Sequence, residues 1–569
     1  MKYCWLVAPS QPARCAQLGA AANISPLLAQ CLLNRGLNDP DSIVQFLQPR
    51  LKQLADPFLI PNLAAAVERL LLARERGELI CIFGDYDVDG VTSTALLHEI
   101  LTALGWKVEY YLPRRLEEGY GLSQDGVENC LQKFPIKLLL AVDCGSTAVA
   151  SIAWLRGKGV DAIVLDHHQV STPSPEAVAL VNPQLGSVAR ELCSVGLAFK
   201  MAHALLKRLR EAAVEAAVQL DLRTYLDLVA LGTIADLVPL TGENRILVSA
   251  GLERLNVTKR PGIYALMTVS KSPLPIGCYE VGFQLAPRLN AAGRLEDAEE
   301  ALRLVLARDL ATAEPIAARL DIRNRERQNI ERAIAEEVIR DIRARFDAQK
   351  DFVIVEGRPS WHIGVVGIVA SRVLQEFYRP TFILGGDDAV WRGSGRSIEG
   401  FDLAAALRSC DDLLVRHGGH AMAAGVTIQP DKVDLFRARL NELARATLKP
   451  EQLQPRLNID AEIVLSDLTI DRVDELARLN PSGQGNPAVR LAIRGLVHQQ
   501  APQRMGKENQ HVKFRVTDGK QMLEAVWWNC GTAPLPKIGF DLAFTASINE
   551  YNGRRSVQLK MLDWRERTT

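Results

Sequence analysis

Short apolar runs alternate with longer amphipathic stretches between residue 78 and about residue 250. The runs ICIF, YYL, LLLAV and AIVL are separated by segments such as TSTALLHEILTALG, which suit helices. This alternation predicts a parallel sheet covered by helices on both faces. In such sheets ligands bind beyond the carboxyl ends of the strands, so the residues that follow each run are the first candidates for a site.

A long amphipathic segment without glycine follows at residues 315–346. Apolar residues recur every four positions from Ile330 to Ile342, and Pro315 suits a first helical turn. The pattern predicts a long helix that connects two lobes, although packing on the first lobe alone fits the same pattern. A second α/β pattern comes next, with strand DFVIVEG, helix IVASRVLQEF and strand TFILGG.

Beyond residue 455 short alternating runs replace the helical pattern. HVKFRV, MLEAVWW, DLAFTA and SVQLKML predict a small β domain, a barrel or sandwich of about five strands. The expected fold class is therefore α/β, with two α/β lobes joined by a long helix and a C-terminal all-β domain. The expected parts are an N-terminal helical segment (1–77), the first lobe (78–300), connector helices (301–346), the second lobe (347–450) and the β domain (455–569).

The composition is that of a folded protein with no global charge. The chain has 569 residues, 48% of them hydrophobic, and 67 basic against 67 acidic side chains. Any polyanion site must therefore be local. The ten cysteines include no C-x-x-C pair, which favours reduced thiols over disulfides or structural zinc. Because we find neither a signal-peptide pattern nor an apolar run of the ~18 residues that span a membrane, we expect a cytoplasmic protein.

Three aspartates stand at alternate positions directly after the first apolar run. In ICIFGDYDVDG, Asp85, Asp87 and Asp89 would project to one side of an extended chain, where like charges raise one another's pKa. The arrangement therefore calls for a cation. An EF-hand loop begins with the same spacing but needs Glu at its twelfth position, which is Leu96 here. An acidic turn remains the alternative for this segment taken alone.

Further acidic and histidine side chains follow other predicted elements. Asp143 follows LLLAV; Asp166, His167 and His168 follow AIVL; and the helix DLRTYLDLVALGTIA ends at Asp236. Carboxylates with imidazoles and without thiolates suit Mn²⁺ or Mg²⁺ better than structural zinc. A pair of such ions activates water and binds a phosphoryl group. We therefore expect a metal site at this edge of the sheet, with an ordinary loop as the alternative for the histidine pair alone.

The segments GDYDVDG, VDCG, LDHH and ALGTIADLVPL, in this order, resemble the motifs of the DHH phosphoesterases. RRLEEGYGLS, APRLNAAGR, GVVGIVASR, GSGRS and GGHAMAAG extend the resemblance to the RecJ family within that group. The resemblance implies a DHH domain at 78–300, a DHH-associated substrate-binding domain at 347–450 and an OB-fold at 455–569. It implies two Mn²⁺ or Mg²⁺ ions, with catalytic roles for Asp87, Asp89, Asp143, His167, His168 and Asp236, and with Asp85 and Asp166 as further metal ligands.

The same resemblance implies contacts with substrate. Arg372, Ser394, Arg396 and His420 match positions that hold phosphates. Arg288, Asn290 and Arg294 would line a DNA channel, with a helix cap and solvated arginines as the alternative. In the β domain, basic and aromatic side chains such as Phe514 and Trp527 would hold a single strand by charge and stacking. Because alternate residues of a strand point into the core, about half of the aromatic residues would only pack.

The implied function is that of a single-stranded-DNA-specific 5′-to-3′ exonuclease, which releases 5′-mononucleotides in DNA repair and recombination. The implied partners are single-stranded DNA, the single-stranded DNA-binding protein and a repair helicase, with the chain itself a monomer. A phosphoesterase for short oligonucleotides or cyclic dinucleotides and a non-catalytic scaffold of the same fold remain alternatives. Phe83 stands where many DHH proteins have histidine, and Cys144 where many have asparagine, which leaves the preferred metal open.

Overall fold

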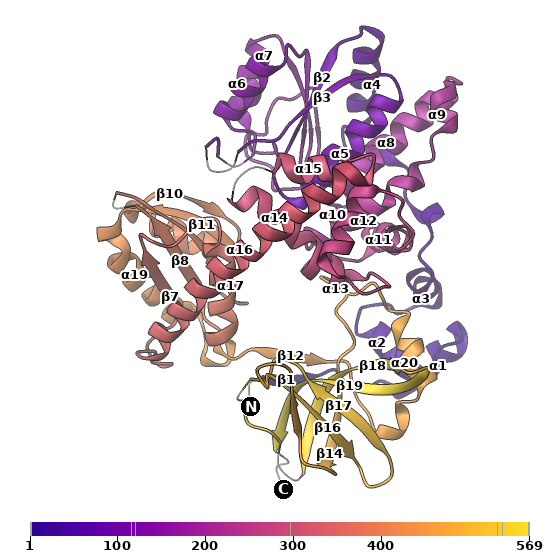
Figure 1. Ribbon diagram of the computed structural model, residues 1–569, viewed down its shortest axis with the longest axis vertical. Helices are drawn as coiled ribbons and strands as arrows, with labels where there is room; N and C mark the ends of the chain where they lie inside the picture. The colour runs from indigo at the N-terminus through magenta and orange to yellow at the C-terminus, as the bar shows by residue number, and fades with distance from the viewer. Residues whose placement is uncertain are drawn as a thin grey trace. The chain divides into compact units, whose positions relative to one another are not determined.

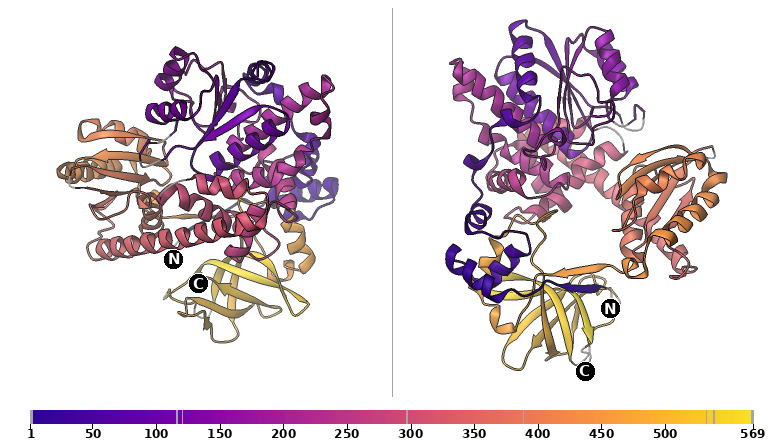
Figure 2. Two further views of the ribbon diagram at one scale, coloured as in Figure 1. Left: turned by 45° about the horizontal axis from the view of Figure 1, so that its top comes forward. Right: turned by 180° about the vertical axis from the view of Figure 1, so that it is seen from behind.

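The computed structural model describes residues 3–114, 117–119, 121–295, 298–387, 389–531, 533–536 and 539–566. The chain divides into two compact units, which Figure 1 and Figure 2 trace from three directions. The first unit comprises residues 49–328 and 481–487, and the second comprises residues 1–48, 329–480 and 488–569. In the predicted RRLEEGYGLS motif, Arg115, Leu116 and Tyr120 lie outside the described residues.

The first unit is built on a five-stranded parallel sheet, which confirms the predicted βαβ alternation. The strand order is β3 (Lys107–Tyr111), β2 (Leu79–Gly84), β4 (Leu138–Val142), β5 (Asp161–Leu165) and β6 (Ala179–Val181). Helices α4 (Leu63–Glu75), α5 (Val88–Ala103) and α8 (Ser194–Glu211) cover one face, and α6 (Gln124–Lys133) and α7 (Val149–Gly157) cover the other (Figure 1).

Coverage of both faces explains why the strands are apolar throughout. Along β4, Leu138, Leu140 and Val142 pack with α5 and α8, whereas Leu139 and Ala141 pack with α6 and α7. A strand buried on both sides needs a continuous apolar run rather than alternation. The carboxyl ends of β2, β4 and β5 consequently lie side by side, where the acidic motifs begin.

Further helices complete the first unit. They are α10 (Leu226–Ala235), α11 (Gly242–Leu255), α12 (Pro261–Ser270), α14 (Ala286–Leu295) and α15 (Glu299–Val305). Residues 481–487 close this unit: the backbone N–H of Leu240 donates to the carbonyl of Gln484 at 2.7 Å.

The long helix α16 (Leu310–Arg343) starts earlier than predicted, and Pro315 lies inside it. Asp309 provides the start signal, because its Oδ1 accepts a hydrogen bond from the Thr312 N–H at 2.8 Å. Ile316 and Leu320 pack in the first unit's core, whereas Val338 and Ile342 pack in a core of the second unit. The helix therefore connects the two lobes, as predicted.

The second unit contains two sheets of more than two strands. One has the order β10 (Leu414–Gly419), β11 (Ala423–Ile428), β9 (Trp391–Arg396), β8 (Thr381–Gly386) and β7 (Ile354–Arg358). Helices α16 and α17 (Val366–Phe377) cover one face of it, and α18 (Leu403–Arg408) and α19 (Val433–Thr447) cover the other.

The C-terminal sheet has seven strands, where the sequence predicts about five. Its order is β13 (Ala461–Glu462), β14 (Leu491–His498), β18 (Phe540–Tyr551), β19 (Arg554–Glu566), β17 (Met522–Trp527), β16 (His511–Thr517) and β15 (Gln503–Met505), and β14 also pairs with β16. The extra strands β13 and β15 are too short to show an alternating pattern.

The N-terminal segment is not purely helical, in contrast to the prediction. Strand β1 (Cys4–Val7) pairs in parallel with β12 (Arg456–Ile459). Helices α1 (Pro12–Ala22), α2 (Pro26–Leu33) and α3 (Pro40–Leu47) pack into the core of the β domain. Among the described helices, none alone is long and apolar enough to cross a membrane; only α1 and α2 together pass that test, and they are bent by 107°.

The first unit holds a buried ion pair between Lys200, which is fully buried, and Glu243, which is 8% exposed. Lys200 Nζ lies 2.8 Å from Glu243 Oε2 and donates to the carbonyl of Ala55 at 2.7 Å. We predict that Lys200→Met destabilises this unit by about 3–5 kcal/mol, because the carboxylate is left buried without its cation. The double variant Lys200→Met/Glu243→Gln should lose less. Thermal unfolding followed by circular dichroism tests this, and a single variant as stable as wild type would contradict it.

Candidate metal centre and nucleic-acid contacts

The first acidic motif is a strand-to-helix turn rather than an extended strand. Strand β2 ends at Gly84 and α5 begins at Val88. Asp87 caps the helix: its Oδ1 accepts hydrogen bonds from the N–H groups of Asp89 at 2.9 Å and Gly90 at 3.2 Å. The predicted one-sided projection of three aspartates from extended chain is therefore wrong, because Asp89 belongs to the first helical turn.

The tightness of this turn depends on a glycine. A Cβ atom at Gly90 would lie 2.5 Å from the carbonyl oxygen of Asp85, which no real side chain tolerates. Gly90 thus lets the first turn of α5 approach the end of β2 closely. This close approach places Asp89 beside the carboxyl ends of the neighbouring strands.

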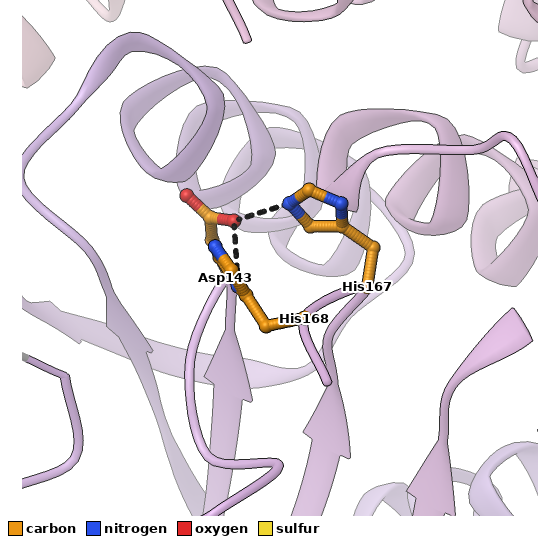
Figure 3. A group of neighbouring side chains, drawn as sticks. All are labelled: Asp143, His167 and His168. Carbon is orange, nitrogen blue, oxygen red and sulfur yellow. Dashed lines mark ion pairs between the residues drawn. The ribbon is translucent and has the colours of Figure 1, made fainter. Parts of the chain in front are cut away.

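Side chains from four segments converge on His167. Its Nε2 lies 3.5 Å from Asp143 Oδ1, 3.5 Å from Asp236 Oδ2 and 3.9 Å from Asp89 Oδ2. Figure 3 shows the imidazoles of His167 and His168 directed at the same carboxylate oxygen of Asp143. Three groups have ligand atoms within 4.8 Å of one another: Asp143–His167–His168, Asp89–His167–Asp236 and Asp85–Asp87–Asp143. The predicted acidic and histidine residues are thus brought together at one edge of the sheet.

The charges of this cluster fit a cation. Burial, with repulsion from Asp87, raises the pKa of Asp89 to about 7. Burial, with repulsion from Asp89 and Asp87, raises the pKa of Asp236 to about 9, and the same causes raise the pKa of Asp143 well above its usual value. Burial, followed by the neighbouring His168, lowers the pKa of His167 to about 4, so its imidazole is neutral, as a metal ligand must be.

His167 Nε2 and Asp236 Oδ2 of the cluster are buried and have no hydrogen-bond partner among the described residues. Buried polar atoms are rarely left in this state, since an unmade hydrogen bond costs about 1–3 kcal/mol. Both atoms are good ligands for a divalent ion, and they face each other at 3.5 Å. The donor set of carboxylate and imidazole groups fits Mn²⁺ or Mg²⁺.

Asp166 has a different environment from the other aspartates. Its Oδ1 accepts hydrogen bonds from the N–H groups of His167 at 2.8 Å and His168 at 3.1 Å, and its Oδ2 accepts one from Ser146 N–H at 2.9 Å. Oδ1 also lies 2.7 Å from His168 Nδ1. Both carboxylate oxygens are therefore engaged, and Asp166 belongs to none of the three ligand groups. These contacts favour a role for Asp166 in orienting His168, rather than the predicted role of metal ligand.

The pKa values of this pair agree with that role. Burial alone would raise the pKa of Asp166, but the hydrogen bond and charge of His168 hold it below its usual range. Burial likewise opposes the charge on His168, but the hydrogen bond that its ring donates to Asp166 raises its pKa to about 9. His168 is thus held by Asp166, whereas His167 stays neutral and directed at the carboxylates.

Two supporting residues are absent from the sequence prediction. Asn182 is fully buried, and its Nδ2 donates to the His168 carbonyl at 2.8 Å and to Ser146 Oγ at 2.9 Å. Asn182 directly follows β6, and residues after strand ends are candidates for a site. It is missed because β6 is too short to be predicted from the sequence. Ser194 contacts Asp89 and Asp143, and no sequence pattern marks it.

The two departures from the family motifs lie in the core behind the ligands. Phe83 is fully buried and stacks on Tyr111 with ring centroids 5.4 Å apart. Cys144 is also buried in this core, where its Sγ donates to the Phe83 carbonyl at 3.9 Å. Neither side chain is part of the three ligand groups.

In the second unit, two of the predicted phosphate contacts lie together. Arg396 Nη1 donates to Ser394 Oγ at 2.8 Å on β9. A Cβ atom at Gly367, in the first turn of α17, would lie 3.0 Å from Ser394 Oγ and 3.1 Å from Arg396 Nη2. Arg372, on the same helix, pairs with Glu331 at 2.6 Å. His420 is exposed and follows β10.

Helix α14 of the first unit carries the three predicted channel residues. Asn290 Oδ1 accepts a hydrogen bond from the Val88 N–H at 3.2 Å, which places this side chain next to the first acidic motif. Arg288 Nε donates to Asp321 Oδ1 at 2.9 Å. Arg294 is partly exposed. Asn290 therefore lies beside the loop that carries the first acidic motif.

The predicted DNA contact of Phe514 is wrong, whereas that of Trp527, which is only partly buried, stays a prediction. Phe514 is only 3% exposed in the core, and Trp527 packs against the same core. The phase of the strand alternation directs these side chains inward. The neighbouring Trp528 is 49% exposed and Tyr551 is 71% exposed. These two, with the exposed Arg515 and Arg554, are available to a single strand.

Three family models match the chain. They are the DHH family N-terminal domain at residues 79–233, the DHHA1 domain at 350–446 and the RecJ OB domain at 459–563. The first match lies in the first unit, the second in the second unit, and the third in the second unit except for residues 481–487. The three matches follow the order of the motifs along the chain.

Relatives of similar architecture are named single-stranded-DNA-specific exonuclease RecJ. The Bacillus subtilis protein is 37% identical over 95% of this chain and 68% of its own length. The Escherichia coli protein is 34% identical over 95% of each chain. The crystal structure of RecJ from Thermus thermophilus with Mn²⁺ is 31% identical with a TM-score of 0.86, and covers 100% of this chain and 80% of that chain. This chain therefore belongs to the RecJ family of DHH phosphoesterases.

Proposed function

We propose that this chain is a metal-dependent exonuclease that degrades single-stranded DNA from its 5′ end and releases 5′-mononucleotides. The observation that carries the proposal is the buried cluster around His167, in which two ligand atoms have no hydrogen-bond partner among the described residues. Relatives with the same domains act, by their names, on single-stranded DNA. The direction of digestion is inferred from family membership.

The residues that would hold the ions are Asp87, Asp89, Asp143, His167 and Asp236, with Asp85 and His168 beside them. When bound, two Mn²⁺ or Mg²⁺ ions would lower the pKa of water and neutralise charge on the scissile phosphate. The neutral imidazole of His167 offers a lone pair without prior loss of a proton. The hydrogen bond that His168 Nδ1 donates to Asp166 fixes the His168 ring at the partly exposed rim of the site.

The site supports attack by water rather than by a protein nucleophile. The hydroxyl of Ser194 is fully buried and donates to Asp143 Oδ1 at 3.0 Å, so it is held away from any substrate. The thiol of Cys193 is also buried, and burial raises its pKa well above its usual value. A thiol that keeps its proton is a poor nucleophile.

The second unit supplies further contacts for a polyanion. Ser394 and Arg396 beside the first turn of α17 would bind a phosphate, because helix N-termini and guanidinium groups both favour anions. The exposed Trp528 and Tyr551 of the β domain would stack on bases. A β domain of this size favours long strands over dinucleotides as substrate. The complete ligand set argues against a non-catalytic scaffold.

Family membership also supports a cellular role. We propose that the chain acts in DNA repair and recombination as a monomer. Its proposed partners are the single-stranded DNA-binding protein, which would present its substrate, and a repair helicase, which would generate that substrate.

Metal binding should depend on pH in a defined direction. Asp89 and Asp236 bind protons more tightly in the folded, metal-free protein than in the unfolded chain, because their pKa values are raised. This difference contributes fully to folding stability below about pH 4, and the contribution is lost as pH rises through about 7 and 9. Because Mn²⁺ replaces those protons, we expect a larger rise in melting temperature on adding Mn²⁺ at about pH 8.5 than at about pH 6. Differential scanning fluorimetry measures both shifts, and equal shifts would contradict the assignment.

Loss of a single ligand should abolish cleavage but not binding. We expect Asp89→Asn and His167→Ala to lose more than ~100-fold in turnover, beyond the ~10–100-fold typical of a residue that only supports a ligand. Affinity for single-stranded DNA, measured by fluorescence anisotropy, should stay within about threefold, since the phosphate and stacking contacts remain. His203→Ala, a partly buried histidine elsewhere in the first unit, serves as the matched control. Near-normal turnover by either ligand variant would contradict the proposal.

The direction of digestion can be read from end-labelled DNA. With a strand of ~40 nucleotides, longer than the ~4–16 that one OB-fold contacts, we expect immediate release of mononucleotide from a 5′ label and gradual shortening of a 3′-labelled strand. The matching blunt duplex should stay intact. Release from the 3′ label first would refute the proposed direction, and cleavage of dinucleotides alone would favour the short-oligonucleotide enzyme.

A further inference from the structure

The start of helix α8 is bonded to two different metal-ligating carboxylates. The backbone N–H of Ser194 donates to Asp89 Oδ2 at 2.7 Å, and that of Val195 donates to Asp89 Oδ1 at 2.8 Å. The hydroxyl of Ser194 donates to Asp143 Oδ1 at 3.0 Å. Ser194 is fully buried, so water does not compete for these bonds. One residue therefore contacts Asp89 through its backbone and Asp143 through its side chain.

Asp89 and Asp143 belong to different groups of candidate ligands. Asp89 groups with His167 and Asp236, whereas Asp143 groups with His167 and His168 or with Asp85 and Asp87, so His167 is common to two of the groups. They also come from different elements, since Asp89 is in α5 and Asp143 follows β4. The spacing of two bound ions would depend on how these carboxylates are held relative to each other. Ser194 bonds to both carboxylates and therefore restrains their relative position.

The surroundings of Ser194 hold it in place. A Cβ atom at Gly232 of α10 would lie 2.3 Å from Thr92 Oγ1, 2.8 Å from Val195 Cγ1 and 3.2 Å from Asp89 Oδ1. A side chain at position 232 of α10 would therefore clash with side chains of α5 and α8, so these three helices pack closely around Asp89. The preceding residue, Cys193, donates from Sγ to Thr233 Oγ1 of α10 at 3.5 Å, close to the end of that helix at Asp236.

We propose that Ser194 is a positioning residue that fixes the carboxylates of Asp89 and Asp143 relative to each other, and that its hydroxyl orients Asp143 for metal binding. The proposal rests on the proposed function of the metal centre. The serine takes no part in the chemical step, because its proton is bonded to Asp143. Its role is to restrict the carboxylate to one orientation, as partners behind metal ligands commonly do.

The substitution Ser194→Ala isolates the side-chain bond. It removes the hydrogen bond to Asp143 and keeps both backbone bonds to Asp89. We expect Mn²⁺ affinity at one of two sites to weaken by ~10-fold or more, measured by isothermal titration calorimetry. The Mn²⁺ concentration for half-maximal cleavage should rise by a similar factor, with the KM for single-stranded DNA unchanged. Ser194→Thr, which keeps a hydroxyl, should recover at least part of the affinity.

Ser151→Ala is the matched control. Ser151 is also a buried serine of the first unit, but its hydroxyl donates to the Leu122 carbonyl, away from the ligands. This variant should bind Mn²⁺ as wild type does. A melting temperature of metal-free Ser194→Ala close to that of metal-free wild type would separate positioning from a general loss of stability.

Two results would overturn the proposal. One is a Ser194→Ala variant that binds Mn²⁺ with wild-type affinity at both sites. The other is a variant whose lower affinity is matched by an equal loss in the melting temperature of the metal-free protein, as a merely structural serine would show. Wild-type protein that binds two Mn²⁺ but leaves DNA intact would instead defeat the proposed function, while the comparison of Mn²⁺ affinities would still test Ser194.

Discussion

Repulsion among buried carboxylates at one edge of a parallel sheet is the constraint on which this structure depends. Parallel strands end on the same edge, so Asp85 after β2, Asp143 after β4 and Asp166 after β5 are forced into proximity. Backbone N–H groups at the starts of α5 and α8 compensate part of the charge, since helix N-termini favour anions. Protons neutralise part of the rest, as the raised pKa values of Asp89 and Asp236 indicate, and a divalent cation would replace them.

At the same edge of the sheet, two consecutive histidines have different pKa values because their surroundings differ. His167 and His168 are consecutive, yet burial lowers the pKa of one to about 4 and the bond to Asp166 raises that of the other to about 9. One carboxylate, itself held by three backbone N–H groups, makes this difference. The histidine pair thus provides one neutral ligand and one oriented ring, rather than two equivalent ligands.

The sequence predicts the strands, the acidic edge and the order of the domains, because each depends on local pattern. The short apolar runs of β2, β4 and β5 alternate with longer helical segments, which indicates strands buried on both faces, and the polar residues after them then define the edge. Two kinds of feature are not predicted: which face of a strand each side chain occupies, and contacts between residues that are distant in sequence. The direction of Phe514 and Trp527 follows from the phase of the alternation, which a pattern of mixed residues leaves open.

Distant contacts account for the other failures. Ser194 looks like any serine at the start of a helix, and its role appears only when α8 packs against α5. Asp89 looks extended until Asp87 is recognised as a helix cap. Asp166 carries the same chemistry as the ligands and differs only in having both oxygens engaged. Residue type therefore identifies the candidates, and three-dimensional contacts divide them into ligands and supports.

The pairing of β1 with β12 has a consequence for biosynthesis. Cys4 pairs with Arg456, and the first unit is closed by residues 481–487, so both units await segments that the ribosome delivers late. At ~5–20 residues per second, the nascent β1 edge and the unfinished first unit stay open for on the order of tens of seconds. The nascent chain must therefore avoid aggregation over that interval. Translation rate and chaperone binding consequently influence the yield of folded protein more than they do for a protein whose domains are consecutive in sequence.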